Sequence, residues 1–474
     1  MYVYGSNRWI SVILISTVFL GTTHLKAGSN GDATEGVNGH GANKSGGVRF
    51  YGATKKFAPS NKSLNHYNGQ NLYYNVKSES FGNKKICGGM AIMGDNESQA
   101  CLTISPAPPA SPTVNTFINV STTAVTPKRK CAEAPAYSVI ELSQTTATLS
   151  SPPVVGCLSP GDEVLLVNQQ GTSLSQVNVG QWELLTLQSV KGSTLTFRDA
   201  KTKYYGKNAS DDSEVGRNAN QQRVSIVRIP RFTNLTIAQG STITANAWDG
   251  YVGGILPLKA ETMQVNGSII GSQLGYRSPP WSYDGSACSN NSTTQFGESI
   301  GGNGVQLGGG GNVLAASGIS FVGNRPVNAG AGHATKGDVG GNANGRVLGQ
   351  FGGSYGVSDG TRLTMGSGTG GNVTCNPSGV SNHPGYWLGG GGIVVLLAEQ
   401  LVVSATGSVQ SNGYTNPLGI NGSGGYVYIN AKNTSVRQGG ISVSGGPANA
   451  YSARSGDGYI FMNSPTTPLA KNGS

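Results

Sequence analysis

The C-terminal part of the chain repeats short apolar runs, and each run directly follows a glycine. Gly392, Gly425 and Gly458 precede the runs IVVLLA, YVYINA and YIFMN, and 33 residues separate each glycine from the next. The runs are rich in β-branched and aromatic residues, which is typical of β-strands. A fixed period of this size, punctuated by Gly and Asn, predicts the stacked coils of a parallel β-helix or a closely related β-solenoid.

A fainter copy of the repeat lies upstream, where Gly254 precedes the run ILPLKA. A second short run follows later in each line, as in GSVQSNG at residues 407–413 and GISVSG at residues 440–445. One such line cannot bury its apolar face alone, whereas stacked lines share a continuous core. We therefore expect the first solenoid lines over residues 231–275 and the C-terminal coils over residues 390–463, with Gly392, Gly425 and Gly458 stacked at one corner.

Residues 137–230 follow a different pattern, in which runs such as SVIEL, EVLLV and VSIVRI are separated by turn signals such as PGD and KG. Strands at this spacing predict a small β-barrel or sandwich. The predicted fold class is therefore all-β, with this small domain followed by a parallel β-helix that carries a large Gly-rich insertion. Residues 28–135 are predicted to be a polar N-terminal region with a Pro-rich linker, and residues 464–474 to be a tail.

The Gly-rich insertion, residues 276–389, separates the upstream line from the last three. Its glycine content is far above the usual composition of proteins. One interpretation is a flexible loop. The other is a compact tip of extended segments, whose backbones approach closely because glycine has no side chain. Cys288 and Cys375 flank much of the insertion, which favours the ordered tip.

Several aromatic residues lie in or beside this insertion. On a polar, Gly-rich surface, such rings can stack on sugar faces while arginine adds hydrogen bonds. The alternative is that the rings form the only core of the insertion. The predicted ligand-binding residues are Tyr276, Arg277, Trp281, Tyr283, Tyr355 and Trp387.

The N-terminus predicts export. Arg8 precedes the apolar run of residues 10–21, and cleavage after Ala27 would give a signal peptide over residues 1–27. Export permits disulfides, and the chain has six cysteines. Six cysteines allow 15 pairings. Pairing each cysteine with a near neighbour in the sequence suggests the bonds Cys87–Cys101, Cys131–Cys157 and Cys288–Cys375.

Motifs for catalysis are weak throughout the sequence. The Gly39-His40-Gly41 tripeptide resembles a motif of β-helix polygalacturonases, but the partner motifs are missing and it precedes the solenoid. Asp211 and Asp212 offer paired carboxylates, yet they lie in a polar loop where solvated charges are expected. His333 and Asp338 have no nucleophile in a suitable turn beside them. No cysteine–histidine spacing fits a metal site, and we expect neither metal nor cofactor.

The formal net charge is +10, and the positive residues are dispersed in short clusters. Such a balance favours loose attraction to anionic surfaces or polysaccharides. No nucleic-acid-binding module or basic–aromatic stripe accompanies it, so we expect no nucleic-acid partner. A glycan or an envelope component of a target cell is the expected partner, and self-association is a further option.

Three short motifs carry a resemblance to a known group of proteins. GDEVLL at residues 161–166, IPRFTN at residues 229–234 and AWDG at residues 247–250 are similar to glycine-rich exported proteins of predatory and gliding bacteria. The insertion also resembles, more weakly, the Gly-rich tips of phage tail-fibre adhesins. The first resemblance implies an envelope-associated or adhesive role and transfers no catalytic residue.

The sequence therefore predicts a secreted or cell-surface adhesin, or surface-matrix protein, that binds its partner through the insertion and is not an enzyme. Two alternatives stay open. Carboxylates clustered in one groove would favour a polysaccharide-acting β-helix hydrolase or lyase. A long exposed terminal strand would favour a self-assembling extracellular fibre subunit.

Overall fold

The structure is a computed structural model that describes most of the chain from residue 110 onward. The described residues are 110–127, 129–278, 297–302, 330–338, 351–368, 389–415, 421–448 and 453–464, together with four short strands closer to the N-terminus. The chain divides into two units, Met1–Pro106 and Ala107–Ser474. The signal peptide predicted for residues 1–27 lies outside the described residues, as does the tail beyond residue 464.

Two small strand pairs are described in the first unit. Strands β1 (Arg49–Phe50) and β2 (Tyr73–Tyr74) pair in parallel. Strands β3 (Lys85–Gly88) and β4 (Ala100–Thr103) pair antiparallel, and their register sets Cys87 opposite Cys101. The backbone of this hairpin is therefore consistent with the predicted bond between these two cysteines.

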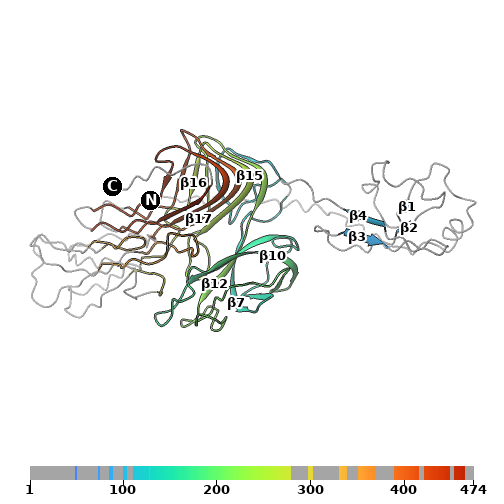
Figure 1. Cartoon of the computed structure of the whole chain (residues 1–474), viewed down its shortest axis with the longest axis horizontal. Coiled ribbons are helices and arrows are strands. Elements are labelled where there is room, and N and C mark those ends of the chain that lie inside the picture. Colours follow the sequence, from blue (N-terminus) through green and yellow to red (C-terminus); the bar gives the residue numbers. More distant parts are fainter. Residues whose placement is uncertain are drawn as a thin grey trace, which may run out of the picture. The chain divides into compact units, whose positions relative to one another are not determined.

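The second unit is built on a stack of coils, in which the strands form two parallel sheets (Figure 1). The strands of the first sheet are, in order, β5 (Thr113–Val114), β13 (Arg231–Ile237), β15 (Ile255–Val265), β17 (Ile393–Val403), β19 (Tyr426–Val436) and β21 (Tyr459–Asn463). Those of the second sheet are β6 (Phe117–Asn119), β14 (Thr242–Thr244), β16 (Ser268–Ile270), β18 (Ser408–Gln410) and β20 (Ile441–Ser442).

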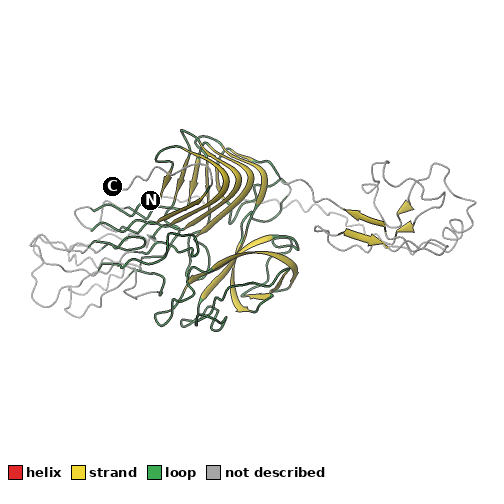
Figure 2. Ribbon diagram, in the orientation of Figure 1, coloured by secondary structure: helices red, strands yellow, loops and turns green. Residues whose placement is uncertain are grey.

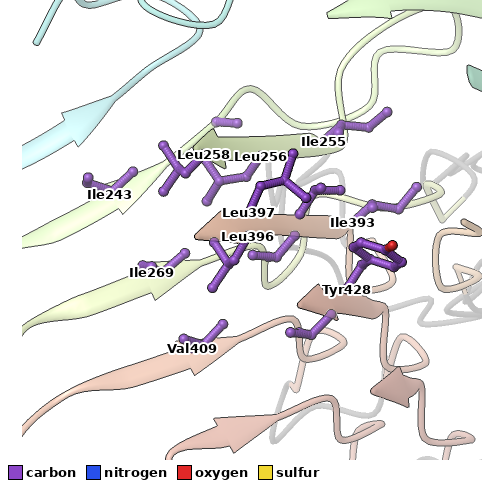
Figure 3. Packing of buried hydrophobic residues seen from close by; sticks show 14 of the residues in the cluster. Ile243, Ile255, Leu256, Leu258, Ile269, Ile393, Leu396, Leu397, Val409 and Tyr428 are labelled. Atoms are coloured by element: carbon purple, nitrogen blue, oxygen red, sulfur yellow. The ribbon is translucent and has the colours of Figure 1, made fainter. Parts of the chain in front are cut away.

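Neighbouring coils stack in register, so the same kind of side chain recurs at each level. Leu258 on β15 is level with Leu396 on β17, which is level with Ile429 on β19. Ile269 of the second sheet is likewise level with Val409 on the next coil. These side chains are fully buried and form one continuous core between the sheets (Figure 3). The fold is therefore an all-β parallel β-helix, as the repeat predicts.

The repeat glycines form one corner of the stack, and this prediction is confirmed. The residues that follow them pair in register from coil to coil. The amide of Tyr426 donates to the Gly392 carbonyl at 2.8 Å, and the amide of Tyr459 donates to the Gly425 carbonyl at 2.9 Å. A Cβ atom on Gly425 would lie 2.1 Å from the Gly392 oxygen. Only glycine permits this close approach of successive backbones.

A closed antiparallel barrel follows the first coil, with strand order β10-β11-β8-β7-β12-β9. Its interior is apolar and includes Leu166, Leu187, Leu195, Phe197 and Ile226. Of the two folds predicted for this region, a small β-barrel or a sandwich, the structure shows the barrel. Its strands are β7 (Ala136–Leu142), β8 (Thr146–Leu149), β9 (Glu163–Gln170), β10 (Trp182–Lys191), β11 (Thr194–Phe197) and β12 (Arg223–Arg228).

The first coil comes from the region that the sequence assigned to the polar N-terminal part. Strands β5 and β6 pair in parallel with β13 and β14, so the stack begins before the barrel in the sequence. The barrel is therefore inserted between the first and second coils. A disulfide between Cys131 and Cys157 links the segment after the first coil to the barrel, which confirms that predicted pair. Cys288 and Cys375 lie outside the described residues.

The first half of each long strand is covered on both faces. Val394, Val395 and Leu396 are consecutive and all fully buried. One face lies against the coil core. On the other face, the barrel residue Trp182 meets the Tyr428 ring edge-on at 5.0 Å, and Tyr428 stacks on Phe461 at 5.1 Å. A strand buried on both faces carries a continuous apolar run rather than an alternating one, as the run IVVLL does here.

Candidate ligand-binding site

Extended glycine-rich segments leave the coils on one side and pack together beside the strands (Figure 2). We call this region the glycine bundle. Hydrogen bonds between backbones run from segment to segment: the amide of Gly366 donates to Gly391, that of Gly391 to Ser423, that of Gly424 to Gly456, and that of Gly456 to Ala331, over 2.7–2.9 Å. The bundle comprises residues 271–278, 297–302, 330–338, 351–368, 389–392, 411–415, 421–425, 443–448 and 453–458.

The bundle has backbone where an ordinary core has side chains. A Cβ atom on Gly366 would lie 2.4 Å from the oxygen of Gly424, 2.5 Å from that of Ser423 and 2.9 Å from the nitrogen of Gly391. Backbones at this separation leave no room for a side chain, which explains why glycine occupies these positions in the described segments. The described parts of the insertion are therefore the closely packed, extended segments expected by the second of the two interpretations.

One buried histidine fastens the insertion to the coils. The carbonyl of Gly424 lies 2.7 Å from Nδ1 of His333 and can only accept, so Nδ1 carries the proton and donates. Nε2 then accepts from the Thr364 hydroxyl at 2.8 Å. The ring also contacts Tyr355 at 4.8 Å and Tyr459 at 5.0 Å. Complete burial lowers the pKa of His333 to about 4, so the ring is neutral at pH 7 and acts as a structural link.

Two of the predicted ligand contacts make packing contacts here: Tyr276 lies in the hydrophobic core, and the partly buried Tyr355 packs against it. Tyr276 is fully buried, and its hydroxyl donates to the Gln169 carbonyl of the barrel. Tyr276 is part of the hydrophobic core, which favours the alternative interpretation of this residue as a core residue. The Tyr355 hydroxyl donates to the Met365 carbonyl at 2.5 Å, and burial raises the pKa of Tyr355. Hydrogen bonds of the two hydroxyls therefore hold the insertion in place: that of Tyr276 joins it to the barrel, and that of Tyr355 joins two of its own residues.

Arg277 is held in an ion pair at the base of the bundle. Its Nε lies 2.9 Å from Oε2 of Glu298, and its Nη1 donates to the Asp249 carbonyl at 2.6 Å. Glu298 is itself buried and also accepts from Gln170 of the barrel at 3.1 Å. Arg277 therefore connects three parts of the second unit. The remaining predicted contacts, Trp281, Tyr283 and Trp387, lie outside the described residues.

The ends of the intervening stretches are gathered at the bundle. Residues 279–296, 303–329, 339–350, 369–388, 416–420 and 449–452 each begin and end at a bundle residue. Hydrogen bonds join these ends to one another: the amide of Gly330 donates to Asp338, that of Asp338 to Arg454, and that of Gly352 to Gly330, over 2.8–3.0 Å. The bundle is thus a hydrogen-bonded base at which the ends of several stretches of the chain lie together. The sequence signal for this base was the glycine content itself.

The candidate catalytic groups are engaged in local structure. Asp212 forms an ion pair with the buried Lys201 and accepts from the Tyr205 amide at 3.0 Å. Asp211 accepts from Asn208 and Ser213, which closes the turn between them. Among the described residues, no group of three or more His, Cys, Asp or Glu side chains is placed to hold a metal ion. The same part of the chain has no helix long and apolar enough to cross a membrane.

No protein-family model and no curated protein matches the chain. Among solved structures, it is similar to the tailspike gp49 from Pseudomonas phage LKA1, with 16% identity and a TM-score of 0.14 over 29% of this chain and 22% of that one. It is also similar to the Gp54 tailspike of Acinetobacter baumannii bacteriophage AP22, solved with a capsular saccharide, with 12% identity and a TM-score of 0.15 over 71% and 46%. A third is the tailspike gp61 of Pseudomonas phage phi297, with 13% identity and a TM-score of 0.14 over 76% and 62%. The matched parts span less than two thirds of each tailspike.

Proposed function

We propose that the protein is an exported, cell-surface or secreted adhesin that binds a glycan or envelope component of a target cell. The binding residues lie on the stretches that start from the glycine bundle. The observation that carries this proposal is the set of hydrogen bonds that joins the ends of these stretches, such as the one from Asp338 to Arg454. A rigid scaffold that presents several loops together is a common arrangement for binding sites.

The residues in these stretches suit sugar recognition. Trp281, Tyr283 and Trp387 belong to them, and aromatic rings offer large, flat apolar faces. The sequence around them is polar and weakly charged, so neutral hydrogen bonds to sugar hydroxyls would accompany the stacking. Three described carboxylates in the same part of the molecule, Glu298, Asp359 and Asp457, are occupied by protein partners. This supports binding rather than hydrolysis as the principal activity.

The test uses the full mature chain on a glycan array, followed by a target-cell binding assay with the glycans that score. The triple variant Trp281→Ala, Tyr283→Ala, Trp387→Ala should lose at least tenfold in affinity, since each stacked ring is worth on the order of 1 kcal/mol. The matched control is Phe117→Ala, because Phe117 is an exposed aromatic residue that lies on the first coil.

Deleting the whole of residues 276–389 is not a useful variant, because the deletion would also remove the segments that cover Tyr426 and Tyr459. The proposal fails if no glycan binds, or if the triple variant binds as well as Phe117→Ala. Release of new reducing ends from a bound polysaccharide would overturn the non-enzymatic assignment and make the protein a depolymerase.

A further inference from the structure

Two arginines of the barrel meet one tyrosine of the coil stack. The guanidinium carbon of Arg217 lies 4.1 Å from the centre of the Tyr251 ring, and that of Arg223 lies 5.1 Å from it. Both distances are within the range of cation–π interaction. Arg217 lies on the loop before β12, and Arg223 begins that strand. Tyr251 follows the Trp248 corner of the coil stack, so the cluster lies where the barrel and the coils join.

Local hydrogen bonds hold the cluster in place. The Asp249 carboxylate accepts from the amides of Tyr251 at 2.7 Å and Val252 at 2.8 Å, which fixes the turn that carries the ring. Arg223 is only 9% exposed, and its Nη1 donates to the carbonyls of Gly216 at 2.7 Å and Asn218 at 2.8 Å. Arg217, in contrast, is exposed. One guanidinium is therefore fixed at the base of the cluster while the other is open to solvent.

The Glu298 carboxylate is near enough to act on the charge of Arg223 but forms its ion pair with Arg277. In the part of the chain that the structure describes, neither Arg217 nor Arg223 forms an ion pair within 4.0 Å. The carboxylate of Glu298 already accepts from Arg277 and from Gln170. Burial lowers the pKa of Arg223, and the like charge of Arg217 lowers it further. An external anion would relieve this repulsion.

We infer that Arg217, Tyr251 and Arg223 form a subsite for a carboxylate-bearing sugar of an acidic polysaccharide. A guanidinium presents a planar fork of donors that matches a carboxylate, which a single lysine ammonium does not. The tyrosine ring holds the exposed fork by stacking and offers its free edge to the sugar. This inference rests on the proposed glycan binding, but it assigns a second contact to residues that do not belong to the stretches that carry Trp281 and Trp387.

The experiment measures binding of the full mature chain to immobilised polygalacturonate, with neutral dextran, heparin and duplex DNA as further probes. Arg217→Gln should weaken polygalacturonate binding about tenfold, the effect of one charge-assisted hydrogen bond. Arg217→Lys keeps the positive charge but loses the planar fork of donors, so its affinity for polygalacturonate should lie between that of the parent and that of Arg217→Gln. The matched control is Arg231→Gln, which removes the same charge from an exposed arginine at the start of β13 and should leave affinity unchanged.

Each other outcome overturns the inference. Equal losses for Arg217→Gln and Arg231→Gln would show a general charge effect. Stronger binding to heparin would assign the subsite to sulfate esters, and equal binding to DNA would show that no sugar is recognised. Failure here is distinguishable from failure of the proposed function, because array binding that depends on Trp281, Tyr283 and Trp387 would then persist in Arg217→Gln.

Discussion

The coil stack and the glycine bundle hold the same chain together by opposite means. In the coils, backbones are separated by side chains such as Leu258, Leu396 and Ile429, which fill the space between two parallel sheets. In the bundle, backbones touch one another directly, as Gly366 does at Gly424 and Gly391. The coils are stabilised by burial of apolar surface, whereas the bundle depends on backbone hydrogen bonds and on the absence of side chains.

This difference determines how each region tolerates change. A core of side chains can repack around a smaller residue, although a cavity remains. A core of backbone has no side chain to move, so any added atom must displace a neighbouring segment. The bundle should therefore be far less tolerant of substitution at its interior than the coils are. It is also the region that presents the proposed binding stretches, so its rigidity bears directly on function.

The largest expected effect comes from Gly366→Ala. The new Cβ atom would overlap three backbone atoms of two neighbouring segments, and we expect a loss of more than about 4 kcal/mol, the range diagnostic of severe mutations. Amide hydrogen exchange should accelerate in residues 330–338, 351–368 and 389–392 while β13 and β15 stay protected. Gly439→Ala is the matched control, because a Cβ there meets nothing within 4 Å and only its φ of +69° is strained. Equal effects of the two variants would contradict the backbone-packed core.

Leu396→Ala tests the other half of the comparison. Leu396 is fully buried in the coil core, and its truncation should cost about 2–5 kcal/mol through lost burial and a residual cavity. Denaturant unfolding should show a loss of stability for the whole coil stack, with faster exchange in β15, β17 and β19. Val402→Ala on the same strand should cost under about 1 kcal/mol, since the Val402 side chain is only partly buried. A local effect confined to the bundle would refute this assignment of the core.

The coils were predictable because each coil repeats the same order of glycine and apolar residues at a constant spacing in the sequence. The spacing of Gly392, Gly425 and Gly458 predicts both the register and the corner. The first coil was missed because β5 and β6 are only two and three residues long, too short to show a pattern among Pro, Ser and Thr. The sequence also contains a signal that was not used, the continuous apolar run IVVLL. A strand with one face in solvent would alternate apolar and polar residues instead. The run indicates that something covers the outer face of β17.

The site was only partly predictable, because its contacts join residues far apart in the chain. Tyr276 was predicted as a ligand contact, with a core residue as the open alternative, and it is buried against Gln169 of the barrel. Nothing local to Tyr251 announces that Arg217 and Arg223 of the barrel lie against its ring. Glycine content, in contrast, correctly indicated close backbone packing, because only that residue fits such contacts.

Acid should loosen the contact between the insertion and the coils. The pKa of His333 is about 4 in the folded protein against about 6.5 in an unfolded chain, so between these values the unfolded chain binds a proton that the folded one does not. Stability should therefore fall as pH drops from about 6.5 to about 4, by roughly 3 kcal/mol in total from this group. Above pH 7 the group contributes no slope.

The measurement compares denaturant unfolding of the parent and His333→Gln at pH 7, 5.5 and 4.5. The glutamine is uncharged at every pH, so the variant keeps the background from the carboxylates but loses the histidine contribution. The parent should lose more stability than the variant on acidification. Parallel curves would show that His333 is not buried as a neutral ring.

The smallest effect concerns Tyr355→Phe, and it separates the two interpretations of that residue. The hydroxyl donates to the Met365 carbonyl at 2.5 Å and lies 2.8 Å from Oγ of Ser367, so its removal should cost about 1–2 kcal/mol, mainly within the bundle. The ring would still pack on His333. Tyr428→Phe is the control, since no hydrogen bond of the Tyr428 hydroxyl occurs among the described residues, and it should be nearly neutral.

If Tyr355 is a core residue, Tyr355→Phe lowers bundle stability in hydrogen exchange and leaves affinity for the array glycans unchanged. If affinity falls while protection of residues 351–368 is unaltered, the partly exposed tyrosine is a ligand contact, and the bundle would then bind the ligand itself rather than only support the stretches that bind it.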